Sequence, residues 1–194
     1  MIRPVSFISA PSILGLRPTG VERFPKALID NGLLERLKAS YGGEIISPPY
    51  SQQRDYETGM LNPFAIRDYS ISLADKIGKV LDNGEFPFVA GGDCSILIGN
   101  LLALRRRTER CGLIYFDGHA DYYGAKESPT GEVADMVLGV VTGGGHSVLS
   151  NIEGRRPLVR EEDTFLFGYR DQEEAERDGS RDILTSGIEA ISFE

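Results

Sequence analysis

Short apolar runs alternate with segments of helical spacing along almost the whole chain. The runs are expected to be strands, and they comprise residues 4–11, 44–49, 86–95, 111–121, 164–171 and 188–193. Several are apolar at consecutive positions, so both faces of the strand would be buried, which is typical of a parallel sheet covered by helices on both sides. The sequence therefore predicts an α/β fold whose functional sites lie at the carboxyl ends of the strands.

The segments between these runs carry helix signals. Residues 62–84 have the clearest ones, because Asn62 can cap the helix, Pro63 fits its first turn and Asn83-Gly84 can end it. An apolar stripe with steps of three and four residues runs along this segment, formed by Ile66, Tyr69, Leu73, Ile77 and Val80. Further helices are expected over residues 21–40, with an interruption at Asn31-Gly32, over 96–107 and over 172–184.

Length and charge limit the classes of function. The 194 residues suffice for one domain, here expected to be 1–194, and a net charge of -8 makes nucleic acid an unfavourable partner. No apolar stretch approaches the about 20 residues that cross a bilayer, so no membrane span is expected. Two cysteines and no signal-peptide pattern at the N-terminus point to the cytoplasm.

Ligand-type side chains follow two of the expected strands. Asp117, His119 and Asp121 alternate after one apolar run, and Cys94 follows another, next to Asp93. Alternate side chains on an extended backbone share a face, so the three could surround one cation such as Mn²⁺, Fe²⁺ or Zn²⁺. A solvated turn with an incidental histidine would fit the same pattern. For Cys94 a small buried hydrophobe remains the alternative to ligation, and Asp93 suits a capping or supporting role better than direct ligation.

Four motifs together resemble the ureohydrolases, the family of arginase, agmatinase and formiminoglutamase. The sequences GGDCS (91–95) and FDGHADYY (116–123) are similar to that family's GGDHS and DAHxD signatures. Residues 15–37 resemble its G-x₄-GVE entry segment, and FGYRD (167–171) resembles its later strand, so the resemblance covers nearly the whole chain. Several short motifs in family order are far more specific than any one of them.

The resemblance implies a three-layer α/β sandwich with a central parallel sheet and a two-metal site, usually manganese. Its implied activity is metal-dependent hydrolysis of linear C–N bonds in guanidino or amidino compounds, on a small guanidino substrate. A homo-oligomer is expected on another ground, because a sheet edge and face without their last strands favour association with another chain. Carried over by position, Asp117 would bridge both ions, His119 would bind one and Asp121 the other, while Cys94 occupies the place of the family's first histidine ligand. A thiolate there shifts the expected metal toward Zn²⁺ or Fe²⁺.

Other departures from the family pattern limit the inference. Thr130 and Ala134 fall where arginases have a serine and a histidine, so L-arginine is not supported as the substrate, and Glu132 is expected to cap a helix. The family's second metal motif, S-[FL]-D-x-D-x-x-D-P, is absent. Glu194 could align with its first aspartate, but the spacing from Tyr169-Arg170-Asp171 favours GIEAISFE (187–194) as the strand before that motif. We therefore expect an N-terminal portion of a longer chain, or a shortened form, that lacks the C-terminal strands.

Several readings remain open from sequence alone. Arg170 and Asp171 could contact substrate or form an ion pair or cap, and His146 lies in an expected mobile loop, TGGGHS. The leading hypothesis is the ureohydrolase-like enzyme, inactive if the chain supplies too few ligands. The alternative is a non-catalytic binding or interaction protein on the same fold. A nucleotide-binding domain ranks last, because Gly91-Gly92 lacks the spacing and the lysine of a phosphate loop.

Overall fold

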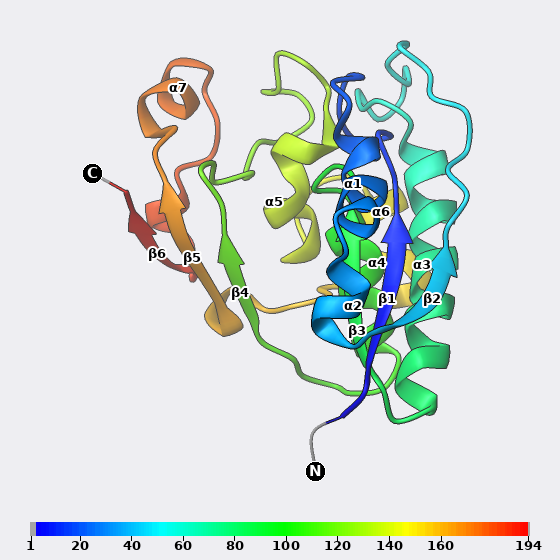
Figure 1. Ribbon diagram of the computed structural model, residues 1–194. Coiled ribbons are helices and arrows are strands. Elements are labelled where there is room, and N and C mark those ends of the chain that lie inside the picture. Colours follow the sequence, from blue (N-terminus) through cyan, green and yellow to red (C-terminus); the bar gives the residue numbers. More distant parts are fainter. Residues whose placement is uncertain (1–2, 194) are drawn as a thin grey trace.

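A computed structural model describes residues 3–193, and Glu194 lies outside the described residues together with residues 1–2. Within this range the chain forms six strands in two parallel sheets of three. The first sheet has the order β2-β1-β3 and the second the order β4-β5-β6. The strands are β1 (Val5–Ala10), β2 (Ser40–Glu44), β3 (Phe86–Gly91), β4 (Leu113–Phe116), β5 (Thr164–Tyr169) and β6 (Glu189–Ser192). Figure 1 shows both sheets with their carboxyl ends at the same rim.

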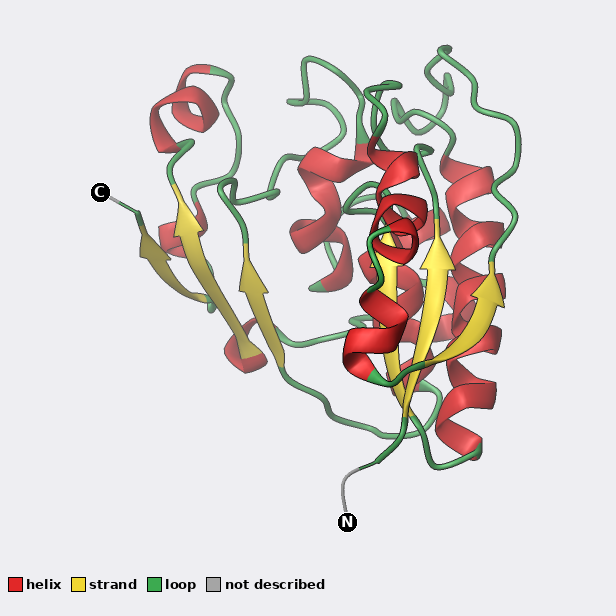
Figure 2. Ribbon diagram, in the orientation of Figure 1, coloured by secondary structure: helices red, strands yellow, loops and turns green. Residues whose placement is uncertain are grey.

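Helices cover both faces of the first sheet. The α-helices are α1 (Phe24–Asp30), α2 (Leu33–Leu37), α3 (Pro63–Asp82), α4 (Ile96–Arg105), α5 (Val137–Val141), α6 (Ser147–Ser150) and α7 (Gln172–Arg177). Short 3₁₀ turns are η1 (Val21–Arg23), η2 (Val133–Met136), η3 (Ile152–Gly154), η4 (Glu161–Asp163) and η5 (Ile183–Thr185). In Figure 2, α1 and α2 lie on one face of the first sheet and α3 and α4 on the other. This layering confirms the predicted α/β fold.

The structure corrects three local predictions. The second strand is β2 (Ser40–Glu44) rather than 44–49, because β1 pairs with the earlier segment in parallel register. A Cβ at Gly42 would lie 2.7 Å from Ser6 Oγ, so the close approach of β2 to β1 requires glycine there. Because glycine has no side chain, the segment shows no apolar pattern in the sequence. The helix expected over 172–184 ends at Arg177. The predicted sheet is also divided, since among the described residues β3 pairs with β1 and β4 with β5.

The ends of the long helix α3 follow the sequence signals only in part. The helix begins at Pro63 and ends at Asp82, and Gly84 adopts a left-handed φ of 75° just beyond it, as expected. Asn62 does not cap the helix with its side chain. Its Nδ2 donates to Leu14 O at 2.9 Å and to Ser51 O at 3.1 Å instead, so this side chain ties the long loop to the start of α3.

The core lies between the helices α3, α4 and α5 and the inner faces of the sheets. The apolar stripe predicted for α3 is buried along its length. Helix α4 packs closely on α3, because Gly99 presents no side chain there: a Cβ would lie 2.9 Å from Ser70 O and 3.0 Å from the Leu73 side chain. The two helices together form a rigid support behind β1 and β3.

The outer face of the second sheet is apolar and exposed. Ile114 and Phe116 on β4 are 68% and 73% exposed, and Phe167 and Ile191 extend the same face onto β5 and β6. The alternate residues Leu113 and Tyr115 pack against the core. The sequence predicts cover on both faces, whereas only one face of this sheet is buried, which leaves it half covered. None of the helices described is both long and apolar enough to span a bilayer.

The close contact of α3 and α4 predicts the effect of Gly99→Ala. Alanine normally stabilises a helix interior by about 0.5–1 kcal/mol relative to glycine. Here its methyl group overlaps the α3 backbone, so we expect urea unfolding to show a loss of about 1–3 kcal/mol. Gly112→Ala is the control, because its Cβ would meet Asp163 O at an ordinary 3.5 Å. Equal stability of Gly99→Ala and the wild type would contradict this packing.

Candidate metal centre

Two chain segments meet where β3 and β4 end. Cys94 lies in the turn between β3 and α4, and Asp117 directly follows β4. Gly92 lets the first turn pass close to a neighbouring loop, since a Cβ there would lie 2.3 Å from Ser12 O. The Asp93 amide donates to Ser12 O at 3.0 Å, and Asp93 Oδ1 accepts the Ser95 amide at 2.9 Å. Asp93 thus has the supporting role expected for it.

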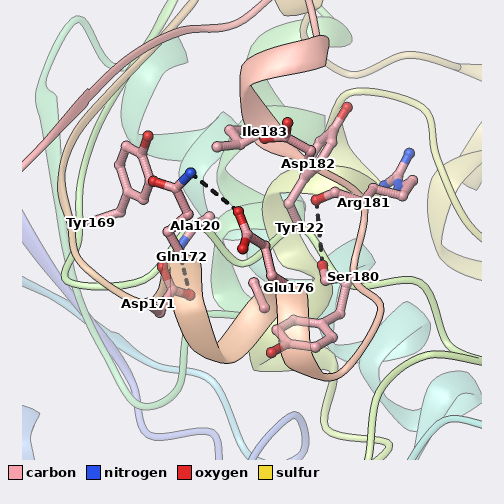
Figure 3. Close-up of a pocket in the computed structure, with 12 residues that line it drawn as sticks. Ala120, Tyr122, Tyr169, Asp171, Gln172, Glu176, Ser180, Arg181, Asp182 and Ile183 are labelled. Carbon is pink, nitrogen blue, oxygen red and sulfur yellow. Dashed lines mark hydrogen bonds between the residues drawn. The ribbon is translucent and has the colours of Figure 1, made fainter.

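The segment from Asp117 to Asp121 is a turn and not a continued strand. The strand ends at Phe116, and Asp117 Oδ1 accepts the His119 amide at 3.0 Å. The next part of the chain is held by the residue that precedes α7: the Asp171 carboxylate accepts the Ala120 amide with both oxygens at 3.1 Å. Figure 3 shows Ala120 and Asp171 side by side among the residues that line a small cavity. This places Asp171 in the scaffold of the site.

Asp121 is held in a backbone conformation that few residues other than glycine adopt. Its φ is +47°. The Asp121 carbonyl accepts the amides of Leu138 at 3.0 Å and Gly139 at 3.3 Å, which fixes it to α5. Such strain at a conformation fixed by its surroundings is common at functional sites. Here it turns the Asp121 side chain back toward Asp117.

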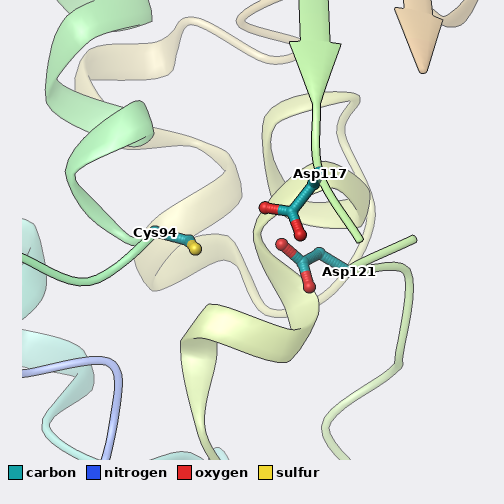
Figure 4. A group of neighbouring side chains, drawn as sticks. All are labelled: Cys94, Asp117 and Asp121. Atoms are coloured by element: carbon teal, nitrogen blue, oxygen red, sulfur yellow. The ribbon is translucent and has the colours of Figure 1, made fainter. Parts of the chain in front are cut away.

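Three ligand-type groups converge in this recess (Figure 4). One ligand atom from each of Cys94, Asp117 and Asp121 lies within 4.8 Å of the others. The His119 side chain is 69% exposed and lies outside this group, with its Nδ1 3.5 Å from Asp117 Oδ1. Of the four predicted ligands, the structure therefore brings three together and places the fourth at the edge.

When the three converging groups are ionised, their surroundings do not neutralise all of their negative charge. Burial raises the pKa of Asp121 well above its usual value, and nearby Asp117 raises it further, against the hydrogen bond from Tyr115 that lowers it. Burial, followed by Asp121 and Asp117, raises the pKa of the Cys94 thiol to about 12. A bound cation would offset this repulsion and favour the ionised forms. The donor set, one thiol and two carboxylates, suits Zn²⁺ or Fe²⁺ and also accepts Mn²⁺.

A cavity of about 230 Å³ opens from Asp121 and is strongly acidic. Its charged lining comprises His119 and the carboxylates of Asp121, Glu132, Asp135, Asp171, Glu174 and Asp178. Glu132 is paired with Arg17, whose Nε lies 3.4 Å from Oε1. Lysine and arginine are absent from the described residues that line the cavity. The cavity therefore favours a cationic occupant.

Known proteins of similar sequence identify the family of this chain. The family model described as "Arginase family" matches residues 3–194. The chain belongs to the arginase family. It is 35% identical over 182 residues to the arginase of Bacillus caldovelox, covering 91% of this chain and 61% of that protein. It is 34% identical to the arginase of Bacillus subtilis (strain 168), covering all of this chain and 65% of that protein.

Solved structures of the arginase family share the fold. The crystal structure of arginase from Bacillus cereus superposes with a TM-score of 0.84 at 30% identity, covering 98% of this chain and 64% of that one. The chain thus spans slightly less than two thirds of the length of these relatives. The family membership and fold expected from the sequence motifs are confirmed.

Some residues of this arginase-family site were missed or misread in the sequence. Asp135 lines the acidic cavity and accepts the Thr130 hydroxyl at 2.8 Å, a charge that interrupts the apolar run VADMVLGV. Tyr115 in β4 was read as part of an apolar strand, yet its hydroxyl enters the recess. Glu132 does not cap η2 with its side chain but accepts the Arg17 amide at 3.2 Å. His146 lies outside the site and caps α6, its Nδ1 accepting the Val148 amide.

The raised pKa of Asp121 predicts how stability depends on pH. The metal-free native chain holds this proton to higher pH than the unfolded chain, so its free energy of unfolding falls as the pH rises above about 4. Asp121→Asn removes the ionisable group and therefore this loss of stability. Its side-chain amide oxygen can still accept the hydrogen bond from the Tyr115 hydroxyl. With chelator present, urea unfolding at pH 7.5 should therefore show a variant more stable than the wild type, with a smaller difference at pH 5. A variant less stable at pH 7.5 would contradict this assignment.

Proposed function

We propose that this chain carries the metal-binding site of a metal-dependent hydrolase of linear C–N bonds in guanidino or amidino compounds. The observation that carries the proposal is the convergence of Cys94, Asp117 and Asp121 beside an acidic cavity in a chain of the arginase family. Two carboxylates and a thiol held together in a buried recess are a stable arrangement when a cation joins them.

The proposed ligands are Cys94, Asp117, His119 and Asp121. His119 is included because its exposed side chain can rotate toward Asp117, only 3.5 Å from its Nδ1. The proposed ion is divalent, with Mn²⁺ typical of the family and Zn²⁺ or Fe²⁺ favoured by the Cys94 sulfur. When bound, such an ion supplies Lewis acidity and activates water as a nucleophile.

The residues around the recess would orient the substrate. A guanidinium group is planar and cationic, and carboxylates bind it with paired hydrogen bonds. Asp135 and Asp171 face the cavity next to Asp121 and would hold such a group close to the ion. Addition of water to the central carbon, with loss of the amine, yields urea from a guanidino substrate. We further propose a cytoplasmic location and a homo-oligomeric state.

One observation favours a second candidate, a non-catalytic binding protein. Within the described residues the recess brings together one ligand atom from each of three residues, and one of these is a thiol whose pKa is raised to about 12. A site for two ions needs more ligands than this. The two candidates differ in a simple way, since the second predicts metal uptake without turnover.

Metal content tests the proposed ligands. After loading with Mn²⁺, Zn²⁺ or Fe²⁺ and desalting, elemental analysis should find metal in the wild type and none in Asp117→Asn. His119→Ala should lose metal as well if the histidine completes the site. Glu162→Gln, which changes an exposed carboxylate on the turn before β5, should keep the wild-type content. Unchanged stoichiometry in Asp117→Asn would exclude this recess as the site.

The charge of the cavity predicts substrate preference. A guanidino compound with a terminal amine should bind better than the matching compound with an added carboxylate, because the cavity lining is acidic. We expect a difference of at least about tenfold in Kd or KM, or about 1.4 kcal/mol. Urea release from a panel of such pairs, supplied with each metal, measures both preference and activity. Preference for the carboxylate-bearing member would contradict this reading, and binding without urea release would favour the non-catalytic candidate.

A further inference from the structure

One polar group in the metal recess has no part in the proposed ligand set. Tyr115 lies in β4, two residues before Asp117, which directly follows the strand. The Tyr115 hydroxyl donates to Asp121 Oδ2 at 2.5 Å. Its ring packs against the apolar core, while the hydroxyl points into the acidic recess.

This hydrogen bond joins two elements of the site. Asp121 belongs to the turn after β4 and is attached to α5 through its carbonyl, whereas Tyr115 is fixed in the sheet. The phenol therefore holds the Asp121 carboxylate at one oxygen and leaves the other for a ligand. A strong hydrogen bond to a carboxylate favours its ionised form, which is the form that binds cations.

The Tyr115 hydroxyl gives its single proton to Asp121, one of the three groups whose ligand atoms lie within 4.8 Å of one another. The phenol thus provides a neutral donor among three groups that repel one another when ionised. It can do so without a charge of its own, because a phenol that donates its hydroxyl proton in a hydrogen bond is neutral.

We propose that Tyr115 is a positioning residue of the metal centre: its hydroxyl fixes the Asp121 carboxylate toward Cys94 and Asp117, so that a divalent ion meets a preorganised ligand. The inference rests on the proposed metal centre and assigns a role to a side chain outside its ligand set. Groups that orient metal ligands in this way typically account for about 10–100-fold in metal affinity.

The structure offers a closely matched pair of variants for the test. Tyr115→Phe removes the hydroxyl beside Asp121, and Tyr122→Phe removes another phenol that donates to a carboxylate at 2.5 Å, Glu161 Oε1, outside the three-ligand group. Titration with Zn²⁺ or Co²⁺ should show a Kd about 10–100-fold higher for Tyr115→Phe and unchanged for Tyr122→Phe. Circular dichroism and urea unfolding of each variant verify the fold.

A double-mutant cycle separates positioning from a general structural effect. Asp121→Glu lengthens the side chain by one methylene and so disrupts the matched geometry with the phenol. Adding Tyr115→Phe to this variant should therefore change the Kd less than about twofold. The full loss of affinity in both backgrounds would show that Tyr115 acts without Asp121 and would overturn the proposal.

Tyrosine absorption gives a second readout that does not depend on the measured affinity. Binding of spectroscopically silent Zn²⁺ should change the near-ultraviolet absorption of a tyrosine, because the acceptor of the Tyr115 hydroxyl becomes a metal ligand. A metal-dependent change that survives in Tyr115→Phe, or equal Kd values for that variant and the wild type, would overturn the positioning role alone. Failure of the wild type to bind metal would overturn the metal centre and this inference together.

Discussion

Electrostatic repulsion among the acidic groups at the carboxyl ends of β3 and β4 determines what kind of ligand this molecule can bind. Asp121 is only 5% exposed and adopts a left-handed backbone conformation, yet it faces Asp117 and the Cys94 thiol. Burying like-charged groups together costs free energy unless a proton or a cation compensates them. Hydrogen bonds from α5 to the Asp121 carbonyl and from Ala120 to Asp171 hold the turn in place against this cost. The fold thus supports a recess that is stabilised by binding a cation.

The same arrangement connects the recess to its surroundings. The acidic cavity opens from Asp121, so an ion and a cationic substrate would occupy adjacent volumes, each offsetting part of the negative charge. The Tyr115 hydroxyl provides neutral support within the recess, and the rigid packing of α4 on α3 fixes the turn that carries Cys94. The exposed apolar face around Phe116 lies on the opposite side of β4 from Tyr115, so the site and this face share one strand but not one surface.

The sequence predicts most of the fold because apolar runs and helix signals are local properties. It fails where a distant contact decides the structure. Strand β2 contains Gly42 and Gly43 and forms because β1 accepts it as a partner, while the Asn62 side chain binds a loop in preference to its own helix. In the site, the prediction that Asp117 and Asp121 converge is met, but for another reason than the period of two residues, and His119 is misplaced. The strand ends at Phe116, before the predicted ligands begin, and the Asp117 carboxylate forms a turn that sends His119 outward.

Locating the ion directly is the most direct test of this view of the recess. Anomalous diffraction from crystals of the chain grown with Mn²⁺ should show a peak bonded to the carboxylates of Asp117 and Asp121, at metal–oxygen distances of about 2.0–2.3 Å, with the Cys94 sulfur facing the same ion. An ordered recess in which these three side chains diverge, or a peak bound elsewhere on the chain, would contradict it.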